Sequence, residues 1–80
     1  MNIMLRLKNV KINEKVAEAD FYPEGSKSHG HIVVDIAKED EISCSIVDGY
    51  GPAYAAHAKT RLIRIAKERD TRTECVVMWY

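Results

Sequence analysis

Three histidines are the side chains of this sequence best suited to bind a metal ion or to transfer protons. His29 and His31 lie two positions apart on a segment predicted to be extended, so both side chains point to the same side. Asp35, His57 or a cysteine could complete a zinc site. Because no Cys-x-x-Cys or His-Glu-x-x-His spacing is present, we interpret the histidines as surface residues and predict no metal.

A nucleophilic site could be assembled from Ser26 or Ser28 with a histidine and Asp35, or from a cysteine with a histidine. The serines lack the sharp turn that surrounds the nucleophile of a hydrolase. Cys44 and Cys75 lie at apolar strand positions, where burial disfavours a thiolate. A chain of 80 residues also has little room for an active site that excludes water. We therefore predict no catalytic residues, no enzymatic activity and no cofactor.

Two glycine-containing segments, residues 22–30 and 48–52, could bind an anion through backbone N–H groups. The first lacks the glycine spacing and the Gly-Lys-Ser/Thr ending of a phosphate-binding loop. In the second, Pro52 removes one N–H group and Asp48 adds a negative charge. Both segments are therefore predicted to be turns, with glycine supplying positive φ angles.

The run Tyr22-Pro23-Glu24-Gly25-Ser26 is followed by Gly30 and a predicted strand up to Val34. This arrangement resembles a stretch of small uncharacterised proteins from bacteria and phages, and the resemblance covers the middle of the chain. Because such proteins carry no assigned activity, the resemblance implies no catalytic, binding or cofactor residue here.

Basic side chains on a predicted helix offer a surface for the phosphates of a nucleic acid. They share the helix face opposite the apolar stripe and are His57, Arg61, Arg64 and Lys67. Tyr50 and Tyr54, near the start of the helix, could stack on bases. The whole chain is neutral, however, whereas nucleic-acid-binding domains are usually basic. A nucleic-acid-binding module that uses the basic face of helix 53–69 is therefore the alternative function.

The predicted elements that position these residues are two hairpins, a helix and a final strand. The first hairpin occupies residues 3–12 and 15–22, the second occupies residues 31–37 and 41–47, and the helix and final strand follow. In an alternative interpretation, Asn13 caps a short helix that ends at Ala19. The order predicts one α+β domain over residues 1–80, with a mainly antiparallel sheet of four to five strands and one helix packed across it.

Apolar spacing predicts which face of each element is buried. In the second hairpin, the inward residues are Ile32, Val34 and Ile36 on one strand and Ile42, Cys44 and Ile46 on the other. The helix begins after Gly51 at Pro52, and its sheet-facing stripe is Ala55, Ala58, Leu62, Ile65 and Arg69. Leu62 is therefore expected to be buried and Arg64 to be exposed.

Residues 75–80 form a predicted strand that is apolar on both faces. Such a strand is expected inside the sheet or at a contact between subunits. One helix shields only one face of a sheet, and soluble proteins seldom leave a large apolar patch uncovered. Met78, Trp79 and Tyr80 are predicted to form the interface of a two-fold homodimer or of a contact with an unidentified protein partner.

The overall composition excludes several classes of protein. Twelve basic and twelve acidic residues give a net charge of zero, which argues against a polybasic membrane binder. Two cysteines are too few for a disulfide scaffold, and no apolar run is long enough to cross a membrane. We expect a small, non-enzymatic protein of the reducing cytoplasm that acts through a protein partner or through self-association.

Overall fold

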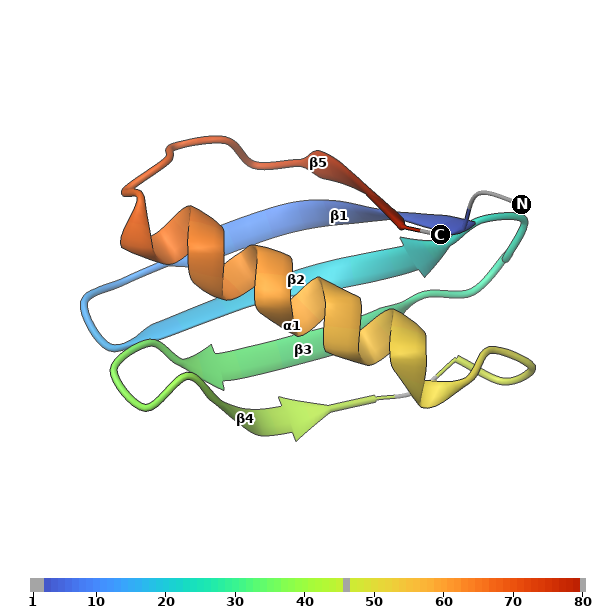
Figure 1. Ribbon diagram of the computed structural model, residues 1–80, viewed down its shortest axis with the longest axis horizontal. Helices are drawn as coiled ribbons and strands as arrows, with labels where there is room; N and C mark the ends of the chain where they lie inside the picture. Colours follow the sequence, from blue (N-terminus) through green and yellow to red (C-terminus); the bar gives the residue numbers. More distant parts are fainter. Residues whose placement is uncertain (1–2, 46, 80) are drawn as a thin grey trace.

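Alternating apolar and polar residues in the first half of the chain form four antiparallel strands joined as successive hairpins. These are β1 (Ile3–Ile12), β2 (Val16–Pro23), β3 (Gly30–Asp35) and β4 (Asp40–Cys44). The chain then forms helix α1 (Pro52–Lys67) and returns beside β1 as strand β5 (Cys75–Trp79). The computed structural model describes residues 3–45 and 47–79, in which the sheet order is β4-β3-β2-β1-β5 (Figure 1). The predicted α+β fold, with one antiparallel sheet and one helix across it, is confirmed.

Helix α1 covers one face of the sheet, and the hydrophobic core lies between the two (Figure 1). Leu62 is fully buried and Arg64 is exposed, as the helical spacing predicts. Pro52 occupies the first helical position, where its missing N–H group would have no partner in the helix. Arg69 continues the predicted stripe in sequence but lies beyond the end of the helix and is exposed. Among the described residues, no helix is long and apolar enough to cross a membrane.

The first hairpin has the predicted form, and the alternative of a short helix after Asn13 is wrong. The side-chain Oδ1 of Asn13 accepts hydrogen bonds from the backbone N–H groups of Lys15 and Val16, both at 2.8 Å. The N–H group of Asn13 donates to the carbonyl of Val16 at 2.9 Å, which closes the turn. An asparagine can stabilise a tight turn in this way as readily as it caps a helix.

A β-bulge changes the phase of β1. Between Lys8 and Lys11, β1 carries one residue more than its partner β2. Asn9 lies in this bulge and adopts a φ angle of 55°, in the left-handed region. Because of the extra residue, Leu7 and Val10 both face the core although they are three positions apart. The outward row of β1 therefore includes Lys8 and the bulge residue Asn9.

A second bulge lies in β4, where Val33 and Val34 of β3 pair with Ser43 and Glu41. Ile42 is the extra residue, and it is 56% exposed. The prediction that Ile42 shares an inward face with Cys44 is therefore wrong, because the bulge interrupts the alternation on which it depended.

Strand β5 lies at the edge of the sheet, so the expectation that it runs inside the sheet is wrong. It pairs with β1 in an unbroken antiparallel register from Trp79 opposite Ile3 to Cys75 opposite Leu7. Val77 is buried beneath α1, whereas Val76 and Met78 alternate with it and are 46% and 53% exposed. Of the predicted interface residues, Met78 is thus at the surface, Trp79 belongs to β5, and Tyr80 lies outside the described residues.

Candidate functional site: the open face of the sheet

We refer to the face of the sheet that α1 leaves uncovered as the open face. Its side chains alternate along each strand with the buried core residues. They include Met4, Arg6, Lys8 and the bulge residue Asn9 of β1, Glu18, Asp20 and Tyr22 of β2, His31 and Val33 of β3, and Val76 and Met78 of β5. The open face is thus polar over β2, and where β1 meets β5 the apolar side chains of Met4, Val76 and Met78 surround the charged Arg6.

Asp20 is the centre of the polar half. Its Oδ1 accepts a hydrogen bond from Nδ1 of His31 at 2.7 Å, and its Oδ2 accepts one from Nδ2 of Asn9 at 2.9 Å. Nε2 of His29 lies 3.9 Å from the same carboxylate, of which only 17% is exposed. Burial tends to raise the pKa of Asp20, but the hydrogen bonds from His31 and Asn9 and the charges of both histidines outweigh it and leave the pKa below its usual value.

Neighbouring side chains extend this cluster across the open face. Oε2 of Glu18 lies 3.8 Å from Nε2 of His31. The ring of Tyr22 stacks on His29 with a centroid distance of 4.8 Å, and Nζ of Lys8 lies 5.2 Å from the Tyr22 centroid. The arrangement is a set of charged and aromatic groups around a largely buried carboxylate, and its outer members are open to contact by a partner.

The structure places the two histidines on one side, as predicted, but their shared partner is Asp20 rather than Asp35. Asp35 accepts a hydrogen bond from the N–H group of Lys38 at 2.9 Å and so stabilises the β3–β4 turn. Within the described ranges, no group of three or more His, Cys, Asp or Glu residues is arranged to hold a metal ion. His57 lies on α1, which packs on the other face of the sheet.

The serines and the two glycine segments form turns. Oγ of Ser26 accepts the N–H group of Ser28 at 3.1 Å and donates to the Ser28 carbonyl at 2.8 Å, which closes the loop on itself. The hydroxyl of Tyr50 donates to the carbonyl of Glu24 at 3.0 Å and so joins the two glycine segments. Tyr50 also packs edge-on against Tyr54 at a centroid distance of 5.1 Å, and both rings are partly buried.

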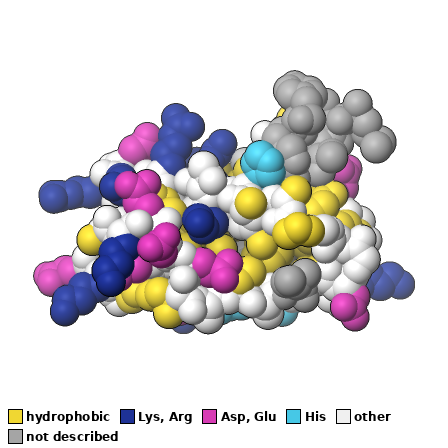
Figure 2. Space-filling model, turned by 60° about the horizontal axis from the view of Figure 1, so that its bottom comes forward, with side chains coloured by type: hydrophobic (Ala, Val, Ile, Leu, Met, Phe, Trp, Pro, Cys, Tyr) yellow, Lys and Arg dark blue, Asp and Glu magenta, His cyan; other side chains and the backbone are white. Residues whose placement is uncertain are grey.

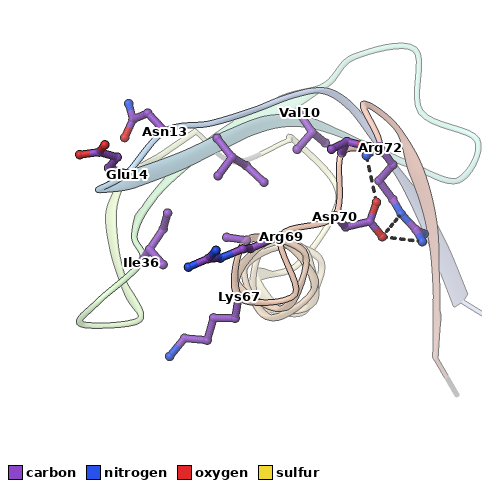
Figure 3. A pocket seen from close by; sticks show the side chains of 11 residues that line it. Val10, Asn13, Glu14, Ile36, Lys67, Arg69, Asp70 and Arg72 are labelled. Carbon is purple, nitrogen blue, oxygen red and sulfur yellow. Dashed lines mark hydrogen bonds and ion pairs between the residues drawn. The ribbon is translucent and has the colours of Figure 1, made fainter.

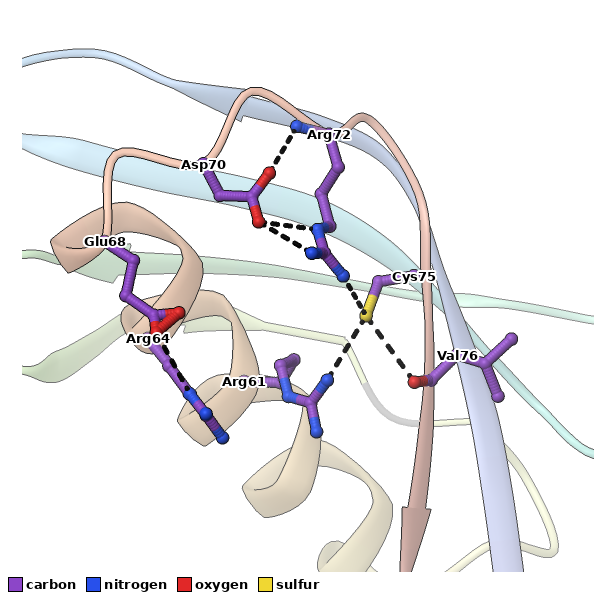
Figure 4. A network of polar contacts seen from close by, with 7 residues as sticks. All are labelled: Arg61, Arg64, Glu68, Asp70, Arg72, Cys75 and Val76. Atoms are coloured by element: carbon purple, nitrogen blue, oxygen red, sulfur yellow. Dashed lines mark hydrogen bonds and ion pairs between the residues drawn. The ribbon is translucent and has the colours of Figure 1, made fainter.

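The basic residues predicted for nucleic-acid binding do not form one continuous patch. Nε of Arg64 lies 3.4 Å from Oε2 of Glu68, and Nζ of Lys67 lies 2.8 Å from Oε2 of Glu39 in the β3–β4 turn. Arg61 points to the opposite flank of the helix, where its guanidinium donates to Sγ of Cys75 at 3.4 Å (Figure 4). His57 is partly buried. Nucleic-acid binding by this face stays a prediction.

Both cysteines are free thiols, as predicted, and each is partly rather than fully buried. Burial, with the nearby charge of Glu41, raises the pKa of the Cys44 thiol. Sγ of Cys75 contacts Arg61 and also the guanidinium of Arg72, which is 3.7 Å away (Figure 4).

Comparisons of the chain with protein-family models, curated proteins and solved structures gave no significant match. The resemblance of residues 22–26 to small bacterial and phage-borne proteins therefore stays a prediction. Sequence reasoning did not single out Asp20 or Asn9. The one available signal was the spacing from Leu7 to Val10, which breaks the period of two at the bulge.

Proposed function

We propose that this protein acts without catalysis, by pairing the free edge of β5 with the same strand of a second copy to form a two-fold homodimer. The observation that supports this proposal is the character of β5: it ends the sheet, has no bulge in its pairing with β1, and has no charged residue from Cys75 to Trp79. The two free cysteines fit a reducing compartment such as the cytoplasm.

The backbone of β5 supplies the directional part of this contact. A strand at the end of a sheet presents a row of N–H and C=O groups that another strand can pair with. In the described part of the chain, β1 is the only strand that pairs with β5. Two β5 strands related by a two-fold axis run antiparallel, which would extend the five strands into a continuous sheet of twice that number.

The side chains of the open face supply the apolar part. With Val77 at the two-fold axis, Val76 of one subunit would lie opposite the partner subunit's Met78, and Met4 would extend this apolar strip within each subunit. Apolar cross-strand pairs stabilise a sheet by roughly 0.2–1 kcal/mol each. A net charge of zero removes the long-range repulsion between copies.

Sedimentation analysis over a wide concentration range tests this proposal. The wild-type protein is expected to reach twice the 9.1 kDa mass of one chain as its concentration rises. The double variant Val76→Lys/Met78→Lys should stay at the mass of one chain, because charges on an edge strand oppose pairing. Ile42→Lys is the control: it places a lysine at an exposed aliphatic position of the other edge strand, β4, and should leave dimerisation unchanged.

Two results contradict the proposal. A wild-type protein that keeps the mass of one chain at high concentration excludes the homodimer. A dimer that survives the double variant but is lost on Ile42→Lys moves the contact from β5 to β4. Circular dichroism of each variant shows whether the fold is kept, since all three positions are at the surface.

A further inference from the structure

A groove at the end of the molecule where α1 stops is separate from the open face. It has a volume of about 810 Å³ and lies between the tip of the β1–β2 hairpin, the turn after β3 and residues 69–72 (Figure 3). Its aliphatic lining consists of Val10, Ile12, Ile36 and Ala66. Ile12 is 38% exposed, so an aliphatic side chain is accessible to solvent here. Figure 2 shows that charged side chains gather at this end of the molecule, whereas hydrophobic ones gather near the start of α1.

Arg69 occupies the residue position that ends the helix in a Schellman motif. Its N–H group donates to the carbonyl of Ala66 at 3.2 Å, and the N–H group of Asp70 donates to the carbonyl of Ile65 at 3.1 Å. Arg69 has a φ angle of 56°, a left-handed conformation for which glycine is strongly preferred. The arginine therefore occupies this position at a conformational cost that glycine would not have, which directs attention to the contacts of its side chain.

The side chain of Arg69 points into the groove, beside Ile36 (Figure 3). The other two cations of the lining already have partners: Lys67 with Glu39, and Arg72 with Asp70, both at 2.8 Å. Arg69 forms no ion pair with any of the described residues, although Glu14 lines the opposite wall. An unpaired guanidinium beside the exposed aliphatic side chain of Ile12 is complementary to a carboxylate attached to an apolar chain.

We propose that this groove binds a short peptide segment in which one acidic side chain is flanked by aliphatic residues, with Arg69 paired to the carboxylate. A peptide is favoured over a fatty acid because the groove is open along one side. Small apolar ligands are bound where most of their surface can be enclosed. The flanking aliphatic side chains would cover Ile12 and Ile36, the two isoleucines of the lining.

Fluorescence anisotropy with two labelled, end-blocked peptides tests this inference. The first peptide has the sequence Gly-Leu-Ile-Glu-Leu-Gly, and the second replaces Glu by Gln. The wild-type protein is expected to bind the first peptide about tenfold more tightly than the second, as for a hydrogen bond to a charged group. Arg69→Gly should remove this preference, and Arg69→Lys should keep part of it.

Thermal unfolding separates loss of binding from loss of fold. Glycine relieves the strain at this position, so Arg69→Gly should raise the Tm by about 2–5 °C while it abolishes the preference for the acidic peptide. Lys27→Gly is the matched control: it removes one exposed positive charge outside the groove and should leave peptide binding unchanged.

Three results overturn the inference: equal affinity for the two peptides, no binding of either, or an undiminished preference in Arg69→Gly. Binding of octanoate in place of the peptides would assign the groove to fatty acids and also reject a peptide partner. The double variant Val76→Lys/Met78→Lys should bind the acidic peptide as tightly as the wild-type protein does, because both positions lie on β5 and outside the groove. Peptide binding by this variant therefore tests the groove separately from the homodimer.

Discussion

The two edge strands of the sheet, β4 and β5, are equal in length but opposite in character. β4 carries Asp40 and Glu41, contains a bulge and presents Ile42 as an isolated aliphatic side chain. β5 carries no charge and no bulge, and its exposed residues Val76 and Met78 lie on the same face. Charges and bulges are the means by which proteins prevent a strand edge from pairing with another chain. The β4 edge of this sheet has charges and a bulge, and the β5 edge has neither feature.

This difference has a consequence for assembly. A sheet with two free edges can add copies without end, whereas a sheet with one free edge closes after a single two-fold pairing. The protected β4 therefore fits a homodimer rather than a fibre. The open face has a related division, since the acidic residues Glu18 and Asp20 lie over β2, whereas the residues at the β5 edge, Val76 and Met78, are apolar.

The largest effect is expected from a substitution at Gly30 that displaces the end of β4. A Cβ atom on Gly30 would overlap the Phe21 ring and the Ser45 carbonyl oxygen, just beyond the end of β4. Gly30→Ala should therefore lower the free energy of unfolding by roughly 1–3 kcal/mol, as for other overpacked sites. Urea denaturation measures this. At Gly51 an added Cβ meets no atom within 4 Å, so Gly51→Ala is the control and should cost less stability, because it loses only the preference of the N-cap position for glycine over alanine. Equal effects of the two variants would contradict the close packing at Gly30.

The second prediction concerns the hydrogen-bonded side chains of Asn9, Asp20 and His31, which link β1, β2 and β3. Asp20 has a lowered pKa, so its carboxylate stabilises the fold. This contribution is complete above the ordinary aspartate pKa of 3.8 and is lost as the pH falls from there through the lower folded value. Hydrogen exchange should therefore show that amides between β2 and β3 lose protection in acid before those between β1 and β5.

Asp20→Asn tests the cause of this acid sensitivity. The variant should lose on the order of 1 kcal/mol of stability at neutral pH, because a hydrogen bond to a charged group becomes a neutral one. It should also reduce the difference in acid sensitivity between the two strand pairs. An unchanged difference would show that another carboxylate is responsible.

Most of the fold could be predicted from the sequence because it depends on local spacing. The period of two in β3, the proline at the start of α1 and the stripe through Leu62 each determine an element and its buried face. The bulges at Asn9 and Ile42 depend instead on how each strand pairs with its neighbour, which local spacing does not determine. A shift of one residue in register reverses every side chain beyond it.

The candidate site depends on register more strongly than the fold does. Asp20 meets His31 only because β2 and β3 pair these two residues directly, and Asn9 reaches Asp20 only because of the bulge. No local motif joins three strands, so the sequence indicated the histidines but not their partner. The apolar residues of β5 were equally ambiguous, because a strand that is apolar on both faces fits the centre of a sheet as well as a subunit contact.

The last prediction separates the two forms of protection on β4. Glu41→Val removes one of the edge charges but leaves the bulge that interrupts pairing between β3 and β4. Glu41 is exposed, so the variant should change the free energy of unfolding by less than about 0.5 kcal/mol. If the bulge protects the edge, sedimentation of the variant should match that of the wild-type protein. Growth into species larger than the wild-type assembly would show instead that the negative charge prevents pairing at β4, since the variant then behaves as a sheet with two free edges.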